Sequence, residues 1–195
     1  MMELRLKPKV SGLSIPLEAE VISPDVVVGK TLREVEELRV YHGNRVETLS
    51  EYFEVEGEVA PNPEEQLIIV EGDVSWVKYI GAEMTAGKVI VEGDAGMHLG
   101  SRMTGGEIIV EGSVGDWAGA EMAGGLIRIR GDAGDLLGAA YRGSPEGMRG
   151  GCIFVEGSAG YETGTGMRRG LIVIGGDAAP FTGAHMNGGV IFILG

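Results

Sequence analysis

A unit of about 19 residues, repeated through most of the chain, restricts the fold more than any other feature of this sequence. The stretch "EGDAGMHLGSRMTGG" (92–106) is followed four residues later by "EGSVGDWAGAEMAGG" (111–125). Similarity at a short fixed period is typical of repeat proteins, in which each unit buries its apolar face against its neighbours. The units begin at Leu67, Lys88, Glu107, Leu126, Cys152, Leu171 and Val190.

Each unit opens with the pattern of a β-strand. Its second and fourth residues are always Ile or Val, as in Ile108 and Val110. A spacing of two places both side chains on one face of a strand, and β-branched residues favour strands. Parallel crossovers are overwhelmingly right-handed. We therefore predict an all-β fold, a right-handed parallel β-helix (a solenoid) with about 19 residues per coil.

Glycine and methionine recur at fixed positions of the unit. The sixth and thirteenth residues of every complete unit are Gly, as in Gly112 and Gly119, and we expect them at corners that need positive φ or close stacking. The residue after the sixth is always Asp or Ser, such as Asp94, and is expected to accept a local backbone N–H at the turn. One stacked methionine per unit is expected to fill the core: Met84, Met103, Met122, Met148, Met167 and Met186.

The first part of the chain does not follow the repeat. We predict that residues 1–51 form a short α/β-type extension, an extended segment and a small helix packing on the solenoid, and that residues 52–195 form the solenoid itself. Thr31 and Glu34 make a capping box for a helix from about Leu32 to Leu38. The stretch "YFEVEGEV" (52–59) resembles a degenerate first strand, with Gly57 at its corner.

Two glycine-containing stretches imitate nucleotide-binding motifs. In "VVVGKTLREVEEL" (26–38), Pro24 occupies the place where a phosphate-binding loop needs its first Gly. The stretch "GTGMRRG" (164–170) leads into a strand, whereas a dinucleotide loop leads into a helix. The nonapeptide spacing of calcium-binding repeats is also missing. None of these stretches predicts a nucleotide or calcium site.

We predict no catalytic, cofactor-binding or metal-binding residue in this chain. His42, His98 and His185 share no position of the repeat, and Cys152 has no His near it in sequence. The formal charge of −13 disfavours nucleic acid and anionic membranes as partners. No apolar run approaches the length of a membrane span, and the N-terminus does not resemble a signal peptide. A cytoplasmic location without membrane insertion is expected.

Two features predict contacts with a partner. The third residue of each strand should point outward, yet it is apolar in six units, including Ile90, Ile109 and Phe154. Such a stripe must be covered, either by residues 1–66 or by another subunit. The second feature is a seven-residue insertion, Tyr141 to Gly147, in the fourth unit. Tyr141 and Arg142 are of types enriched in interfaces and Pro145 limits the loop's freedom, although a tolerated surface loop is the alternative.

Several longer stretches carry a family resemblance. They are "IPLEAEVISPDVVVGK", "YHGN" and "FEVEGEV", joined to "GMHLG", "GDWAGAEMAGG" and "GDLLGAAYRGSPEGMRGG". Over residues 13–195 the chain resembles the C subunit of formylmethanofuran dehydrogenase, the tungsten or molybdenum type. Its glycine repeat resembles the wider GXGXG family, which includes the C-terminal domain of glutamate synthase large subunits.

The resemblance implies a non-catalytic scaffold subunit of a complex in one-carbon metabolism and methanogenesis. Such a complex reduces CO2 to formate and formylates methanofuran. Its tungsten or molybdenum pterin, iron–sulfur and binuclear metal sites are implied in partner subunits, one metallopterin-binding and one amidohydrolase-like, and no cofactor is expected in this chain. Longer family members are expected to continue where these repeats stop, after "VIFILG".

Three alternatives remain open from the sequence. The first is the similar subunit of a formyltransferase/hydrolase complex, and the second is a glutamate-synthase-like module. The third is a polysaccharide-binding β-helix, which would need an aromatic platform. Trp76 and Trp117 are offset from one another by the two extra residues of the first unit.

Overall fold

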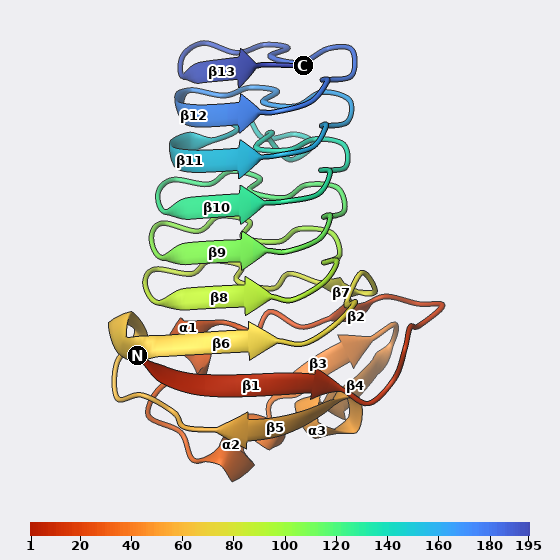
Figure 1. Cartoon of the computed structure of the whole chain (residues 1–195), viewed down its shortest axis with the longest axis vertical. Coiled ribbons are helices and arrows are strands. Elements are labelled where there is room, and N and C mark those ends of the chain that lie inside the picture. Colours follow the sequence, from red (N-terminus) through yellow and green to blue (C-terminus); the bar gives the residue numbers. More distant parts are fainter.

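The computed structural model describes all 195 residues, and the repeat units stack along its long axis (Figure 1). Strands begin at or just before the predicted unit starts and pair in parallel, with Ile108 beside Val89 on one side and Ile127 on the other. These strands are β6 (Gln66–Val70), β8 (Lys88–Val91), β9 (Glu107–Val110), β10 (Leu126–Ile129), β11 (Arg149–Val155), β12 (Arg169–Ile174) and β13 (Val190–Ile193).

The predicted fold class, an all-β, right-handed parallel β-helix, is wrong. The structure is a mixed α/β fold with two mixed sheets of nine and four strands. In the larger sheet, β1 (Met2–Pro8) pairs in parallel with β6 and antiparallel with β5 (Phe53–Gly57). The smaller sheet has the order β4-β3-β2-β7 and again mixes both directions. Its strands are β2 (Leu17–Glu18), β3 (Arg39–His42), β4 (Arg45–Thr48) and β7 (Val77–Lys78).

The correction has a physical reason. The 19-residue period predicts the pairing of only the seven repeat strands. The strands outside the repeat pair in ways that the period does not predict, including antiparallel pairs. The stretch "YFEVEGEV" does form a strand, but β1 lies between it and β6, so it is no first copy of the repeat (Figure 1). Gly57 has a φ of +108°, and a Cβ there would collide with the Glu3 carbonyl oxygen on β1.

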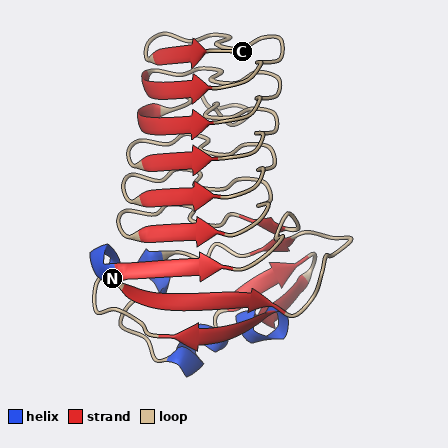
Figure 2. Ribbon diagram, in the orientation of Figure 1, coloured by secondary structure: helices blue, strands red, loops and turns tan.

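Short helices gather at the end of the stack that carries the N-terminal part (Figure 2). The predicted capping box is confirmed in α2, where Glu34 N donates to Thr31 Oγ1 (3.3 Å), but this helix ends two residues earlier than expected. No helix has both the length and the apolar character needed to cross a bilayer. The helices are α1 (Pro24–Val27), α2 (Leu32–Glu36), α3 (Leu49–Tyr52) and the 3-10 helix η1 (Pro63–Glu65).

The core runs through the middle of the stack. From β6 to β12, the second and fourth residues of each unit are at most 3 % exposed, whereas Ile193 in β13 is 49 % exposed. The first five methionines of the series are fully buried, which confirms their predicted role as core residues. Each packs against the last glycine of the following unit: a Cβ added at Gly125 would lie 2.6 Å from Met103 Cε.

The Asp and Ser residues that follow the sixth position link neighbouring units. Asp94 Oδ1 accepts the backbone N–H of Ser113 at 2.7 Å, and Ser113 Oγ accepts that of Asp132 at 3.0 Å. The prediction of a local turn bond is therefore wrong for these residues. Only in the first unit does a local bond form, from Ser75 N to Asp73 Oδ1 at 2.9 Å. Stacking places the next unit's amide closer to each acceptor than its own turn does.

Candidate interaction site

A stack of rings, here called the aromatic ladder (Tyr79, His98, Trp117 and Tyr141), lies along one corner of the first units. Tyr79, His98 and Trp117 occupy the same position of three successive units, and all have positive φ, between 63° and 67°. The ring centroids of Tyr79 and His98 are 4.5 Å apart with planes 9° from parallel. His98 and Trp117 follow at 6.3 Å and 18°. The repeat therefore places one ring above the next.

Tyr141 completes the ladder from the seven-residue insertion. Its ring stacks on Trp117 with a centroid distance of 4.9 Å, and its hydroxyl lies 2.9 Å from His98 Nδ1. Burial lowers the pKa of His98 to about 4, so the imidazole is neutral at pH 7. Burial also raises the pKa of Tyr141, which keeps its phenol protonated. The contact between them is thus a hydrogen bond between neutral groups.

Glu121 fixes the beginning of the insertion. This carboxylate is only 8 % exposed; it accepts the Tyr141 backbone N–H at 3.2 Å and Arg102 Nε at 2.9 Å. Burial acts to raise the pKa of Glu121, but hydrogen bonds from Ser144, Arg102 and Tyr141 outweigh it and hold the pKa below its ordinary value. The Arg102 guanidinium lies 5.2 Å from the centre of the Tyr141 ring. Residues of two successive units therefore hold Tyr141.

A cavity of about 610 Å³ opens beside the ladder, where the N-terminal part meets the first units. Tyr79, Tyr141 and Arg102 line one part of it, and Glu20 and Glu83 contribute carboxylates. Asp25 of α1 also lines the cavity and accepts the backbone N–H of Thr85 at 2.9 Å together with its hydroxyl. This pair of bonds joins the N-terminal part to the first unit.

The predicted partner contacts occupy two separate surfaces. In the insertion, Arg142 and Pro145 are exposed, whereas Tyr141 is folded back onto the ladder and half-buried. Ile90, Ile109 and Phe154 are half-buried on the outward face of the nine-stranded sheet. Their role as partner contacts stays a prediction. The structure brings Ile109 and Phe154 into one column, with only Arg128 between them in register.

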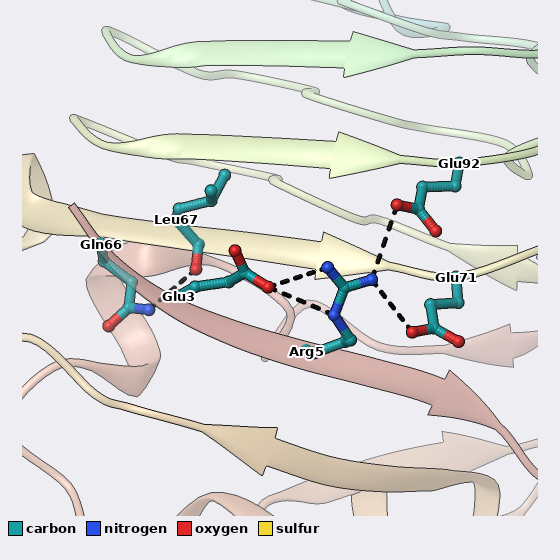
Figure 3. A network of polar contacts seen from close by, with 6 residues as sticks. All are labelled: Glu3, Arg5, Gln66, Leu67, Glu71 and Glu92. Carbon is teal, nitrogen blue, oxygen red and sulfur yellow. Dashed lines mark hydrogen bonds and ion pairs between the residues drawn. The ribbon is translucent and has the colours of Figure 1, made fainter.

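The outward face changes character along the stack. Near β1 it is polar: Arg5 lies 2.8 Å from Glu3, 3.0 Å from Glu71 and 3.6 Å from Glu92 (Figure 3). Near β13 it is apolar and open. The exposed fractions there are 45 % for Val190, 56 % for Phe192 and 70 % for Leu194. Strand β1 extends the sheet edge to edge, so the first 66 residues leave the apolar end uncovered.

The sequence holds a signal for the aromatic ladder that appears only when the units are aligned with one another. Tyr79, His98 and Trp117 each stand two residues before the thirteenth-position glycine, once the two extra residues of the first unit are set aside. Trp76, by contrast, is 5 % exposed and stacks on Phe53 at 5.7 Å. Nothing in the sequence indicates that Tyr141 turns inward. No group of three or more His, Cys, Asp or Glu side chains is arranged to hold a metal ion.

No family model matches the chain. Among curated proteins, it is 49 % identical over 99 residues to the C subunit of tungsten-containing formylmethanofuran dehydrogenase 2 from Methanothermobacter wolfeii, a match that covers 51 % of this chain and 36 % of that protein. It is 51 % identical over 94 residues to the C subunit of molybdenum-containing formylmethanofuran dehydrogenase 1 from Methanothermobacter marburgensis, covering 48 % of this chain and 22 % of that protein. The matches thus span about a third or less of these relatives.

Among solved structures, the chain resembles one in the formyltransferase/hydrolase complex (FhcABCD) from Methylorubrum extorquens in complex with methylofuran. The TM-score is 0.85 at 28 % sequence identity, over 97 % of this chain and 76 % of that one. The likeness to this solved chain extends to the N-terminal part. The sequence relatives confirm the predicted resemblance: this chain is similar to the C subunits of formylmethanofuran dehydrogenases of both the tungsten and the molybdenum type.

Proposed function

We propose that this chain is the structural C subunit of a formylmethanofuran dehydrogenase complex. The observation that carries the proposal is the identity of 49 % and 51 % with subunits of that name. In this proposal the chemistry, CO2 reduction and formylation of methanofuran, takes place at tungsten or molybdenum pterin, iron–sulfur and binuclear metal sites of partner subunits. This chain supplies rigid surfaces that hold the metallopterin and amidohydrolase-like subunits.

The architecture supports such a role. Backbone hydrogen bonds join every repeat unit to the next, and a buried column of Ile, Val and Met runs from β6 to β12. A stack built this way resists bending because each unit is packed on both sides. It presents two surfaces to partners, the exposed tip of the insertion and the apolar column with Ile90, Ile109 and Phe154 on the outward face of the nine-stranded sheet.

A second candidate is the equivalent subunit of a formyltransferase/hydrolase complex. The TM-score of 0.85 over 97 % of the chain favours it. The sequence identity to that chain is 28 %, below the 49 % found with the dehydrogenase subunit, so the dehydrogenase remains our proposal. The two complexes differ in their other subunits, and the identity of co-purifying proteins separates them.

The proposal is tested by purifying a tagged form of the chain together with candidate partners. We expect the metallopterin and amidohydrolase-like subunits to co-elute with it in a fixed ratio during size-exclusion chromatography. Co-elution with a formyltransferase in place of the metallopterin subunit would favour the second candidate. If the chain elutes alone while the other subunits assemble with an established C subunit, the proposal is wrong.

The insertion has its own test within this proposal. Arg142→Glu reverses an exposed charge at the loop tip without touching the ladder, and we expect it to reduce co-elution with a partner subunit. Arg45→Glu is the matched control, because Arg45 is also exposed and forms no ion pair. If both variants assemble as the parent does, the insertion is a surface loop and the interface lies elsewhere.

A further inference from the structure

The cavity beside the aromatic ladder has a surplus of negative charge. Its wall contains the carboxylates of Glu20, Asp25 and Glu83 and one guanidinium, that of Arg102. Arg102 is already paired with Glu121 at 2.9 Å, so its charge is matched outside the cavity. Glu20 and Glu83 are exposed, and neither takes part in an ion pair or side-chain hydrogen bond. Neither carboxylate is therefore held by an ion pair or hydrogen bond, although the charge of Glu83 contributes to raising the pKa of Arg102.

The raised pKa of Tyr79 is further evidence of the negative charge around the cavity. Burial raises the pKa of Tyr79, and the carboxylates of Glu18 and Glu20 raise it further, against the opposing effect of Arg102. The phenol is therefore neutral at pH 7, and it presents a hydroxyl and a ring edge rather than a charge. An anionic ligand such as a phosphate or a carboxylate would be repelled by this wall.

Ser23 adds a buried polar group to the cavity. It is the N-cap residue of α1, yet its side chain makes no capping hydrogen bond, and the residue is only 1 % exposed. Ser23 and the equally secluded Ser101, 4 % exposed, both line the cavity. A buried hydroxyl that leaves its usual capping bond unmade is free to accept or donate a hydrogen bond with a ligand.

We propose that this cavity is a binding site for a guanidinium or ammonium group. Glu20 and Glu83 supply the opposite charge, Ser23 accepts a hydrogen bond, and Tyr79 and Tyr141 contribute aromatic surface, a combination that suits organic cations. The volume of about 610 Å³ exceeds that of one side chain and lies in the range of ligand pockets. The site therefore accommodates the backbone around an arginine or lysine as well as a free amine. This inference does not depend on the proposed function.

The test uses the whole chain labelled with 13C in its tyrosine rings. The probes are N-acetyl-arginine methylamide and N-acetyl-lysine methylamide, with the neutral isostere N-acetyl-citrulline methylamide and the anion N-acetyl-glutamate methylamide as controls. We expect the two cations to shift the Tyr79 and Tyr141 ring signals saturably, and added salt to weaken the effect. Ethylguanidinium distinguishes the source: weaker binding than the arginine probe indicates a peptide-borne cation, and equal binding indicates a free one.

The variant Glu20→Gln/Glu83→Gln should weaken binding of the arginine probe by about tenfold or more, since both charge-assisted bonds are lost. Glu156→Gln/Glu162→Gln is the matched control, because it removes the same charge from exposed residues outside the cavity and should leave binding unchanged. The proposal is overturned if neither cation causes a saturable shift, if citrulline or glutamate probes bind as tightly, or if the two double variants behave alike. None of these results bears on co-purification with partner subunits.

Discussion

Gly119 shows, at the scale of a single residue, why the thirteenth position of the unit is always glycine. Its φ is +62°, and a Cβ would lie 2.5 Å from Ile153 Cδ1 and 3.3 Å from Ile127 Cδ1. Two separate costs therefore oppose any side chain there: backbone strain and overlap with the core. The sequence predicted a corner that needs positive φ or close stacking. The atoms that exclude a side chain are instead the inward isoleucines.

These two costs can be separated by experiment. Gly72 has a similar φ of +69° but open space around the added Cβ, so Gly72→Ala isolates the strain. We expect Gly72→Ala to lower the free energy of unfolding by about 1 kcal/mol and Gly119→Ala by a few kcal/mol. Urea denaturation followed by circular dichroism measures both. Equal losses would mean that Ile153 moves aside at little cost.

His98 gives the stability of the protein a pH dependence. Burial lowers its pKa from the ordinary 6.5 to about 4, so between these values the unfolded chain binds a proton that the folded chain does not. The free energy of unfolding should therefore fall as the pH is lowered from about 6.5 towards 4, the interval between the two pKa values. His98→Gln should reduce this slope. Urea midpoints at pH 7 and pH 5, compared between parent and variant, check this, and identical slopes would refute it.

At the scale of elements, Tyr141 is an anchor for the insertion rather than a contact displayed on it. The ring is held by Trp117 and His98, and its backbone N–H by Glu121, while the next residue, Arg142, is exposed. Trypsin cleaves after arginine only where the backbone can leave its folded path. The rate of tryptic cleavage after Arg142 therefore measures how firmly the loop is held in its folded conformation.

We expect Tyr141→Ala to accelerate tryptic cleavage after Arg142 severalfold, because the ladder no longer holds the loop. Tyr141→Phe, which keeps the ring stack and loses the bond to His98, should have a smaller effect. Tyr161→Ala is a suitable control, since Tyr161 is 53 % exposed and belongs to no aromatic pair. Cleavage rates read by mass spectrometry decide the matter, and a parent-like rate for Tyr141→Ala would show that the loop is held by other contacts.

The elements differ in how well the sequence foretold them. The seven repeat strands start at the predicted unit starts or up to three residues before them, because in each of them alternation, β-branching and period agree. Strand β1 also alternates, with Leu4 and Leu6 buried beside Glu3 and Arg5, but a single short alternating stretch does not say which strand it joins. The pairing depends on long-range contacts, including the buried Gln66, whose side chain donates to the Met2 and Leu67 carbonyl oxygens.

For the whole molecule, the 19-residue period of the sequence correctly predicted that the repeats stack, but it did not predict the fold class. Residues outside the repeat add antiparallel pairs to both sheets and contribute all the α-helices. The candidate site shows the same division. Three rungs of the aromatic ladder could be found by aligning units, whereas Tyr141, Glu20 and Asp25 come from segments that have no counterpart in the other units.

The outward face of the large sheet leads to a final prediction, which rests on the proposed function. Ion pairs occupy its end near β1, including Arg5–Glu71 at 3.0 Å and Lys88–Glu107 at 2.9 Å. The charged side chains at that end are therefore already paired within the chain. Towards β12 the same face carries the half-buried apolar side chains of Phe154 and Val173. A protein partner gains more by covering apolar area than by displacing paired charges. The contact should therefore centre on the part from Phe154 onward.

Phe154→Ser should accordingly reduce co-elution with a partner subunit more than Ile90→Ser does. Both are half-buried apolar residues at the third position of their repeat units, so the pair is matched in position and in burial. Removing Phe154 also frees Arg128, whose guanidinium lies 5.2 Å from the ring centre, and leaves a charge at the contact. Urea midpoints of the two isolated variants control for stability. Equal losses of assembly would place the interface along the whole column, and a greater loss for Ile90→Ser would place it at the polar end instead.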